Sequence, residues 1–330
     1  MEQFLPIAFM LIMGLALLIY TLLDGYDLGV GALLPLANDQ EKDLMIASIG
    51  PFWDANETWI VLGVGVLLIA FPAAHGVILS ALYIPITIML FGLILRGVAF
   101  DFRVKAGDIH KTRWNRLFFI GSVVASASQG WMLGSYITGL QPSLTNTLFS
   151  VLIALTLPAL YVILGASWLM MKTEGALFDK AIKWAQAAII PMGIGLLLVS
   201  IATPLVSQSI ADKWFVLPNA IGLLPIPLSC MIIYAGLLWI LRRPDLLARG
   251  YAWTVFAGLV LICLMASLGL AYSLFPYIVI DRLTIWESAA ATESLQLIFY
   301  GVAITLPAII GYTIFVYKIF HGKARELSYE

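Results

Sequence analysis

The chain has 330 residues, of which 62% are hydrophobic and 11% charged, and its formal net charge is −1 at pH 7. Soluble globular domains carry about 25% charged residues, so this composition excludes a soluble protein and indicates a helical membrane protein. A net charge this close to zero also gives no reason to expect a nucleic-acid partner.

Apolar segments long enough to cross a bilayer, about 20 residues each, follow one another along the chain. They cover residues 5–34, 54–72, 76–100, 117–138, 147–171, 185–206, 217–241, 251–275 and 296–320. We therefore predict an all-α polytopic membrane protein with about nine transmembrane helices, arranged as two four-helix bundles plus one peripheral helix. The whole chain forms one membrane domain, with helices 1–4 in residues 1–140 and helices 5–9 in residues 141–330.

The basic residues predict the orientation of these helices. Of the 18 lysines and arginines, Lys213 and Arg282 fall in predicted outer segments, Arg96 lies within a span, and the others fall in predicted inner segments. By the positive-inside rule, the N-terminus is periplasmic and the C-terminus cytoplasmic. The most basic inner segment, about 101–116, is expected to contact anionic lipid headgroups.

The first span is longer than one crossing requires, so we expect it to tilt, kink or run past the bilayer near its glycines, which include Gly31. Gly25 and Gly29 have the GxxxG spacing, which lets a neighbouring helix backbone approach closely.

Ionisable residues of the first three spans are expected to gather near the inner membrane surface. The first span carries an acid pair about 30 Å from its outer end, the second span begins with another acid pair, and the third ends with an arginine and an acid. Both acid pairs have i,i+3 spacing and therefore share one helix face. These residues are Asp24, Asp27, Asp54, Glu57, Arg96 and Asp101.

Two interpretations of this cluster are open for its single members. Asp54 has the residue type of a helix N-cap, with Glu57 three residues on as in a capping box, and Arg96 can simply neutralise an acid. Capping explains neither Asp24 nor Asp27, however. Because carboxylates in contact with an arginine are typical of proton and ion paths in membranes, we interpret the whole cluster as such a path.

Aromatic residues at the ends of spans have a separate interpretation. Trp53, Trp59 and Trp114 are expected to belong to interfacial aromatic belts. Trp286 and Glu287 precede the last span and are interpreted either as an outer-surface site or as an ordinary exposed loop.

The chain offers few ligands for metals. His75, His110 and His321 all lie at span ends or in loops. Haem in a helical bundle needs axial ligands from the helices, and copper centres need clustered His or Cys. We therefore expect no metal and no cofactor bound by this chain, and no catalysis by the chain alone. If it serves a redox enzyme, the metal lies in another subunit.

Four segments resemble subunit II of the cytochrome bd-type quinol oxidases. They are LDGYDLGVGAL (23–33), IGPFWDANETWIVLG (49–63), LRGVAFDFR (95–103) and LTIWESAAATESL (283–295). The resemblance covers the length of the chain. With Ala55 and Thr58, the second segment is most similar to the cyanide-insensitive branch of the family.

The resemblance implies a terminal oxidase of the bacterial cytoplasmic (inner) membrane, which takes electrons from quinol and reduces dioxygen to water. It implies that this chain is the haem-free subunit and stabilises a haem-bearing subunit I. That partner would hold haem b and haem d, or a third haem b. A small single-span accessory subunit and membrane lipids are further expected partners, and a quinone bound in this chain is left open.

The resemblance also implies that Asp54 takes up protons from the cytoplasm, and we expect Glu57, Asp24 and Asp27 to extend this path. Other motif residues are expected to tune charge or to pack. The expected charge-tuning residues are Arg96, Asp101 and Arg103, and the motif and packing residues are Trp53, Asn56, Gly25 and Gly29.

Two alternatives come from other functional classes. One is a cation-coupled secondary transporter with the acid cluster as its ion site, although such sites usually lie at the bilayer midplane in inverted repeats. The other is a scaffold that binds lipid or quinone and stabilises subunit I.

Overall fold

The computed structural model describes residues 2–105 and 108–324, and within these ranges nine helices are long and apolar enough to span a membrane. This number confirms the prediction. Arg325, one of the basic residues assigned to the inner side, lies outside the described ranges. The spanning helices are α1 (Phe4–Leu33), α3 (Trp53–Ala70), α5 (Tyr83–Lys105), α6 (Asp108–Ile137), α7 (Leu144–Lys172), α8 (Gly175–Val206), α11 (Pro225–Leu241), α13 (Trp253–Leu274) and α14 (Thr292–Ile319).

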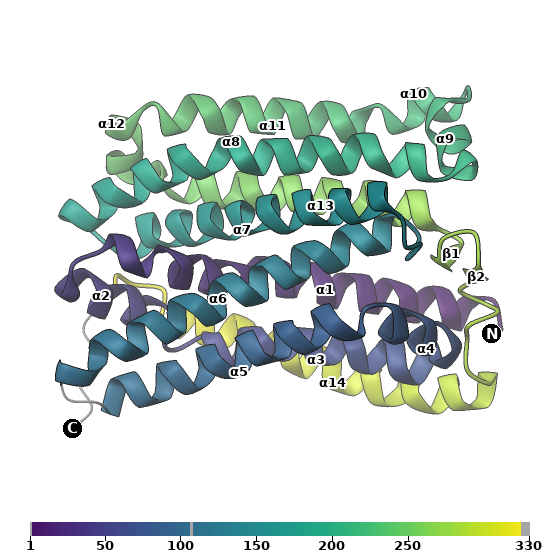
Figure 1. The fold of residues 1–330 in the computed structure, drawn as a ribbon, viewed down its shortest axis with the longest axis horizontal. Helices are drawn as coiled ribbons and strands as arrows, with labels where there is room; N and C mark the ends of the chain where they lie inside the picture. Colours follow the sequence, from purple (N-terminus) through teal and green to yellow (C-terminus); the bar gives the residue numbers. More distant parts are fainter. Residues whose placement is uncertain (1, 106–107, 325–330) are drawn as a thin grey trace.

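The spanning helices run side by side as two four-helix bundles with one helix outside them (Figure 1). The first bundle contains α1, α3, α5 and α6, and the second contains α7, α8, α11 and α13. Helices α1 and α6 pack against α7 and so join the bundles, while α14 lies along the outside and contacts α1. The predicted architecture is therefore confirmed, whereas the orientation in the membrane stays a prediction.

Short elements cover the two ends of the bundles (Figure 1). One end carries the N-terminus, α4 (Pro72–Ala81), α9 (Gln208–Phe215), α10 (Asn219–Leu223) and the antiparallel pair β1 (Tyr277–Val279) and β2 (Leu283–Thr284). The opposite end carries α2 (Asp39–Ile49), the 3₁₀ turn η1 (Leu34–Leu36), α12 (Pro244–Leu246) and the π-helical turn η2 (Leu247–Tyr251).

Two predicted boundaries are wrong. The third span, predicted over 76–100, begins at Tyr83, because the chain breaks at Leu82 and the preceding residues form the separate helix α4. Pro85 lacks the N–H that would continue the earlier helix and its ring would clash with the carbonyl of the fourth residue before it. The predicted inner loop between the fifth and sixth spans is almost absent, since α7 ends at Lys172 and α8 begins at Gly175.

Helix α2 is a short helix that the apolar pattern did not predict. Asn38 and Glu41 form a reciprocal capping box at its start, with hydrogen bonds of 2.9 and 2.8 Å. Its apolar side chains are buried against the core, and Lys180 of α8 donates to Glu41 at 2.6 Å. Helix α2 therefore connects the ends of the two bundles.

Helix α1 is a continuous helix, and Gly25, Gly29 and Gly31 in its second half face neighbouring helices. A methyl group placed on Gly29 would overlap the carbonyl oxygen of Tyr161, and one placed on Gly165 of α7 would lie 2.5 Å from the backbone nitrogen of Val30. At Gly25 it would lie 2.8 Å from the ring of Tyr161. The backbones of α1 and α7 are therefore in direct contact, which no larger residue at these positions allows.

We expect Gly29→Ala to destabilise the protein. Alanine favours a helix over glycine by about 1 kcal/mol, but forcing α1 and α7 apart costs about 1–3 kcal/mol or more. The measurement is the thermal unfolding midpoint of detergent-solubilised protein. Gly14→Ala is the matched control on the same helix, because nothing lies within 4 Å of its added methyl group. Equal midpoints for the two variants would contradict the close contact.

The contact between α2 and α8 is expected to weaken in acid. Burial opposes the charge of Glu41, but the hydrogen bonds from Lys180 and Asn38 outweigh it and lower the pKa of Glu41 below its usual range. A lowered pKa stabilises the folded state above the unfolded pKa of about 4.3, and this contribution is lost as the pH falls through that value and below it.

Lys180→Met should therefore lower the thermal midpoint at neutral pH, and the difference from wild type should shrink as the pH falls towards 4. Lys183→Met, on the same helix and exposed, is the control. A difference that stays constant with pH would show that the ion pair is not its source.

Candidate functional site

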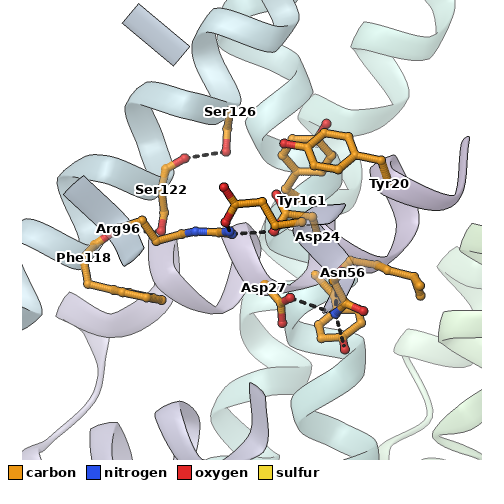
Figure 2. Close-up of polar contacts among 12 residues, drawn as sticks. Tyr20, Asp24, Asp27, Asn56, Arg96, Phe118, Ser122, Ser126 and Tyr161 are labelled. Carbon is orange, nitrogen blue, oxygen red and sulfur yellow. Dashed lines mark hydrogen bonds and ion pairs between the residues drawn. The ribbon is translucent and has the colours of Figure 1, made fainter. Parts of the chain in front are cut away.

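Arg96 of α5 forms ion pairs with carboxylates from two other helices. Its Nη1 lies 2.6 Å from Oδ1 of Asp24 on α1, and its Nη2 lies 2.7 Å from Oε2 of Glu57 on α3. Figure 2 shows the Arg96 side chain extended towards Asp24. The side chains of Arg96 and Asp24 are 1% and 0% exposed, whereas Glu57 keeps 29% of its side-chain surface. The pair thus links the interior of the bundle to a half-exposed carboxylate.

Asp27 lies one helical turn after Asp24 but has a different partner. Asn56 of α3 donates from Nδ2 to Oδ2 of Asp27 at 2.8 Å, as Figure 2 shows. Both side chains are fully buried. Oδ1 of Asp27 and Oδ2 of Asp24 are buried and have no hydrogen-bond partner among the described residues.

Two tyrosines and a glutamine extend the polar cluster between the helices. Gln129 of α6 donates to the hydroxyl of Tyr20 at 2.7 Å, and the hydroxyl of Tyr161 donates to Gln129. Tyr20 precedes Asp24 by one turn of α1, and both tyrosine rings lie beside Asp24 (Figure 2). The buried cluster therefore draws side chains from both bundles.

Asp54 lies at the exposed start of this cluster. It occupies the first turn of α3, one turn before Glu57 on the same face, and is exposed. Its side chain makes no hydrogen bond or ion pair within the described part of the chain. The N-cap of α3 is Phe52, so the interpretation of Asp54 as the cap and of Glu57 as its capping-box partner is wrong. The negative charge of Asp54 still interacts favourably with the N-terminus of the helix.

Asp101 and Arg103 do not join the ion pairs of Arg96. Asp101 is exposed and makes no side-chain hydrogen bond or ion pair to any residue in the described ranges. Arg103 is buried and bonds to Asp43 and Asn115, each at 2.6 Å. It therefore ties the end of α5 to α2 and α6.

The tryptophans divide between two environments. Trp59 is 2% exposed, so its assignment to an interfacial belt is wrong. It follows Asn56 by about one turn and faces inward with it. Trp53 lies 4.9 Å from the ring of Phe100 and beneath the guanidinium of Arg96. Trp114 stacks on Phe102 at the end of α5 and α6, beside a hollow of about 330 Å³ that also includes basic residues.

The predicted outer-surface residues differ from each other in their surroundings. Trp286 borders an open groove of about 650 Å³ near the N-terminus and donates to the carbonyl of Gln3. Glu287 accepts hydrogen bonds from the backbone and hydroxyl of Thr284 at 2.9 and 2.8 Å. Its carboxylate therefore closes a local turn, which favours the interpretation as an ordinary loop for this residue.

Uncharged polar residues of the cluster were missed from the sequence. These residues have no charge and come from four spans: Tyr20 and Tyr26 from α1, Gln129 from α6, Tyr161 from α7 and Tyr317 from α14. One available signal was Gln129, an amide inside an otherwise apolar span, because a buried amide needs partners. Another was the i,i+4 spacing of Tyr20 and Asp24, which places both side chains on one face of the helix.

The cluster is chemically suited to holding protons. It brings the carboxyl groups of Asp24, Asp27 and Glu57 near a single guanidinium, which is always protonated. If all three were ionised, two negative charges would lack a counterion in a poorly solvated place, which is strongly unfavourable. The charge balance therefore favours at least one protonated carboxyl.

The chain's three histidines lie apart from the acid cluster. His75 lies in α4, and His110 and His321 are exposed. Within the described ranges, no three His, Cys, Asp or Glu side chains are placed to hold a metal ion.

Comparison with known proteins supports the motif evidence. The family model of cytochrome bd terminal oxidase subunit II matches residues 5–320. Cytochrome bd ubiquinol oxidase subunit 2 of Bacillus subtilis (strain 168) is 28% identical over 324 residues, which cover 91% of each chain. Cytochrome bd-I ubiquinol oxidase subunit 2 of Escherichia coli (strain K12) is 25% identical over 368 residues, with 97% of this chain and 95% of that protein covered.

The fold has a match among solved structures. A chain of the bd oxidase from Geobacillus thermodenitrificans superimposes with a TM-score of 0.78 at 18% sequence identity, covering 96% of this chain and 98% of that chain. At this identity the match concerns the fold.

Removing the arginine should leave Asp24 buried without a partner. We expect Arg96→Leu to destabilise the protein by about 3–5 kcal/mol, measured from the unfolding transition in detergent. The double variant Asp24→Asn/Arg96→Leu should lose less than the sum of its single variants, because the two side chains interact directly. Arg242→Leu, an exposed arginine, is the control. Additive losses would contradict a direct pair.

Proposed function

The chain belongs to the subunit II family of cytochrome bd terminal oxidases, and from this we propose that it admits protons to a bd-type quinol oxidase. In this proposal the chain binds no haem and stabilises a haem-bearing subunit I, which reduces dioxygen to water with electrons from quinol. Family membership favours this function over a cation-coupled transporter.

The observation that carries the proposal is the bridge that Arg96 makes between Glu57 and Asp24. Protons enter at exposed Asp54 in the first turn of α3. They reach half-exposed Glu57 one turn further on, and then buried Asp24. Arg96 does not itself relay a proton, because a guanidinium does not deprotonate in proteins. It orients the two carboxyl groups and offsets their charge.

The direction of this route rests on the basic residues of the sequence. The positive-inside rule assigns the ends of α2, α5 and α6 to the cytoplasm, and Asp54 lies at the same end of the bundles. Lys105, His110 and Arg113 border the hollow beside Trp114, which suits contact with anionic lipid headgroups at that surface. A small single-span subunit and a quinone site stay expectations from the family.

We expect Asp54→Asn and Asp24→Asn to lower quinol-driven oxygen uptake by the purified oxidase about 10-fold or more, with the haem absorption spectra intact. Proton transfer by a positioned side chain contributes about 10²–10⁴-fold to rates, so loss of a carboxyl group on the route should be clearly measurable. Asp54→Glu keeps a carboxyl group and should retain most of the rate.

Asp179→Asn provides the matched control, because Asp179 is an exposed carboxylate near the same end of the second bundle. Wild-type rates in both acid variants would refute the proton route. A loss of haem absorption in parallel with the rate would instead indicate a scaffold function.

A further inference from the structure

Three side chains from three helices form a closed ring of hydrogen bonds beside Asp27. The hydroxyl of Tyr317 on α14 donates to Oδ1 of Asn56 at 3.0 Å, and Nδ2 of Asn56 donates to the hydroxyl of Tyr26 at 2.8 Å. The hydroxyls of Tyr26 and Tyr317 lie 2.6 Å apart. A tyrosine has one hydroxyl hydrogen, and that of Tyr317 is used by Asn56, so Tyr26 donates to Tyr317. The three bonds therefore run in one direction around the ring.

The ring and the Asp27 carboxylate together orient the amide of Asn56. Its oxygen faces Tyr317 and its NH₂ group faces Tyr26, and the second N–H is directed at Oδ2 of Asp27, 2.8 Å away. The opposite orientation would keep the bonds to both tyrosines with the ring reversed, because a hydroxyl can donate or accept, but it would turn the amide oxygen towards an oxygen of the Asp27 carboxylate. Amide orientation in proteins is assigned from such networks, and here the contact with the Asp27 carboxylate favours the orientation observed.

This orientation makes the two oxygens of Asp27 unequal. Oδ2 accepts from Asn56, while Oδ1 is buried and has no partner in the described ranges. In this orientation a proton on Oδ2 would collide with the N–H of Asn56, so a protonated Asp27 carries its proton on Oδ1.

We propose that Tyr26, Asn56 and Tyr317 are positioning residues, which determine where Asp27 holds its proton and how readily it releases it. The proposal rests on the proton function of the acid cluster given above. It assigns to α14, the peripheral helix, a part in that function through one hydroxyl group.

The surroundings of the ring are suited to this role. Trp168 stacks on Tyr26 at 4.3 Å, and the ring of Phe52 lies 4.6 Å from that of Tyr317. These aromatic side chains separate the hydrogen bonds from solvent, which strengthens them and makes the loss of any one expensive. Lys172 donates to the carbonyls of Phe320 and Gly322 and so fixes the end of α14 beside the ring.

Helix α14 makes few other polar contacts with the bundles. Within its described residues, Tyr317 is the one whose side chain hydrogen-bonds to another helix. Its hydroxyl group is therefore a specific connection between α14 and the interior of the first bundle.

Other charged and titratable groups also act on Asp27. They come from α1, α3, α5 and α14. A change of Tyr317 to phenylalanine removes the hydroxyl group of Tyr317 and leaves the other groups in place. The groups that act on Asp27 are Asp24, Tyr26, Glu57, Arg96 and Tyr317.

The test replaces Tyr317 by phenylalanine in the assembled oxidase. Tyr317→Phe removes one hydroxyl group and keeps the ring that packs on Phe52. We expect haem spectra like those of wild type and a shift of about 0.5 pH unit or more in the half-maximal pH of quinol-driven oxygen uptake, because one lost hydrogen bond alters the balance between charged and neutral Asp27. The infrared band of the protonated carboxyl group, assigned by its absence in Asp27→Asn, should shift as well.

Tyr312→Phe is the matched control, since Tyr312 lies on the same helix, is 60% exposed and makes no hydrogen bond from its side chain to the described residues. It should leave the pH profile and the infrared band unchanged. If Tyr317→Phe does not assemble, Tyr26→Phe opens the ring at its other hydroxyl group and carries the same expectation.

The two proposals fail in different ways. If Tyr317→Phe lowers the thermal midpoint but leaves the pH profile and the infrared band like those of wild type, the ring has only a structural role. Low rates of Asp24→Asn in the same experiments would still support the proton route. Wild-type rates in the acid variants would refute the route itself, whatever Tyr317→Phe does.

Discussion

Arg96 shares its guanidinium between Asp24 and Glu57, and the relative positions of α1, α3 and α5 depend on that fork. A buried carboxylate without a partner is strongly unfavourable, so Asp24 requires Arg96 at hydrogen-bonding distance. A planar guanidinium can donate hydrogen bonds to two carboxylates only within a narrow range of geometry. The same contact leaves an excess of carboxyl groups over cations. This one interaction therefore positions three helices and also creates a site at which protonation of a carboxyl group is favourable.

Close packing around α1 is what makes this polar cluster compatible with a membrane interior. Gly29 and Gly165 bring the backbones of α1 and α7 into contact, which places Tyr161 beside Asp24, and Tyr161 donates to Gln129 of α6. Because α1 touches both bundles, its polar face lies between them, away from lipid. Aromatic side chains close the cluster on the side of α14. Polar partners within the protein thus replace the water that the charged groups would otherwise need.

The features that were predicted correctly depend on residues that are close together in the sequence. Apolar length predicted nine spans, and the i,i+3 spacing of Asp24 and Asp27 predicted a common helix face. That face turned out to meet two partners, Arg96 for one carboxyl group and Asn56 for the other. Trp59 was assigned to the interface because aromatic residues near span ends usually lie there, yet packing against neighbouring helices buries it. Pro85 shows the converse case, because this single residue explains the break between α4 and α5. Hydropathy averaged over a span does not show that break.

The sequence by itself determined the class of protein, the number of spans, the end of the bundle where acids gather and the family. These follow from composition, spacing along one helix and motif letters, all of which are properties of neighbouring positions. The tertiary structure alone decided which carboxyl group Arg96 binds, that Asp54 stays exposed, and that Tyr317 meets Tyr26 and Asn56 across 291 and 261 positions of sequence. Such contacts depend on how each helix is rotated against its neighbours, and that rotation is set by the packing of many side chains together.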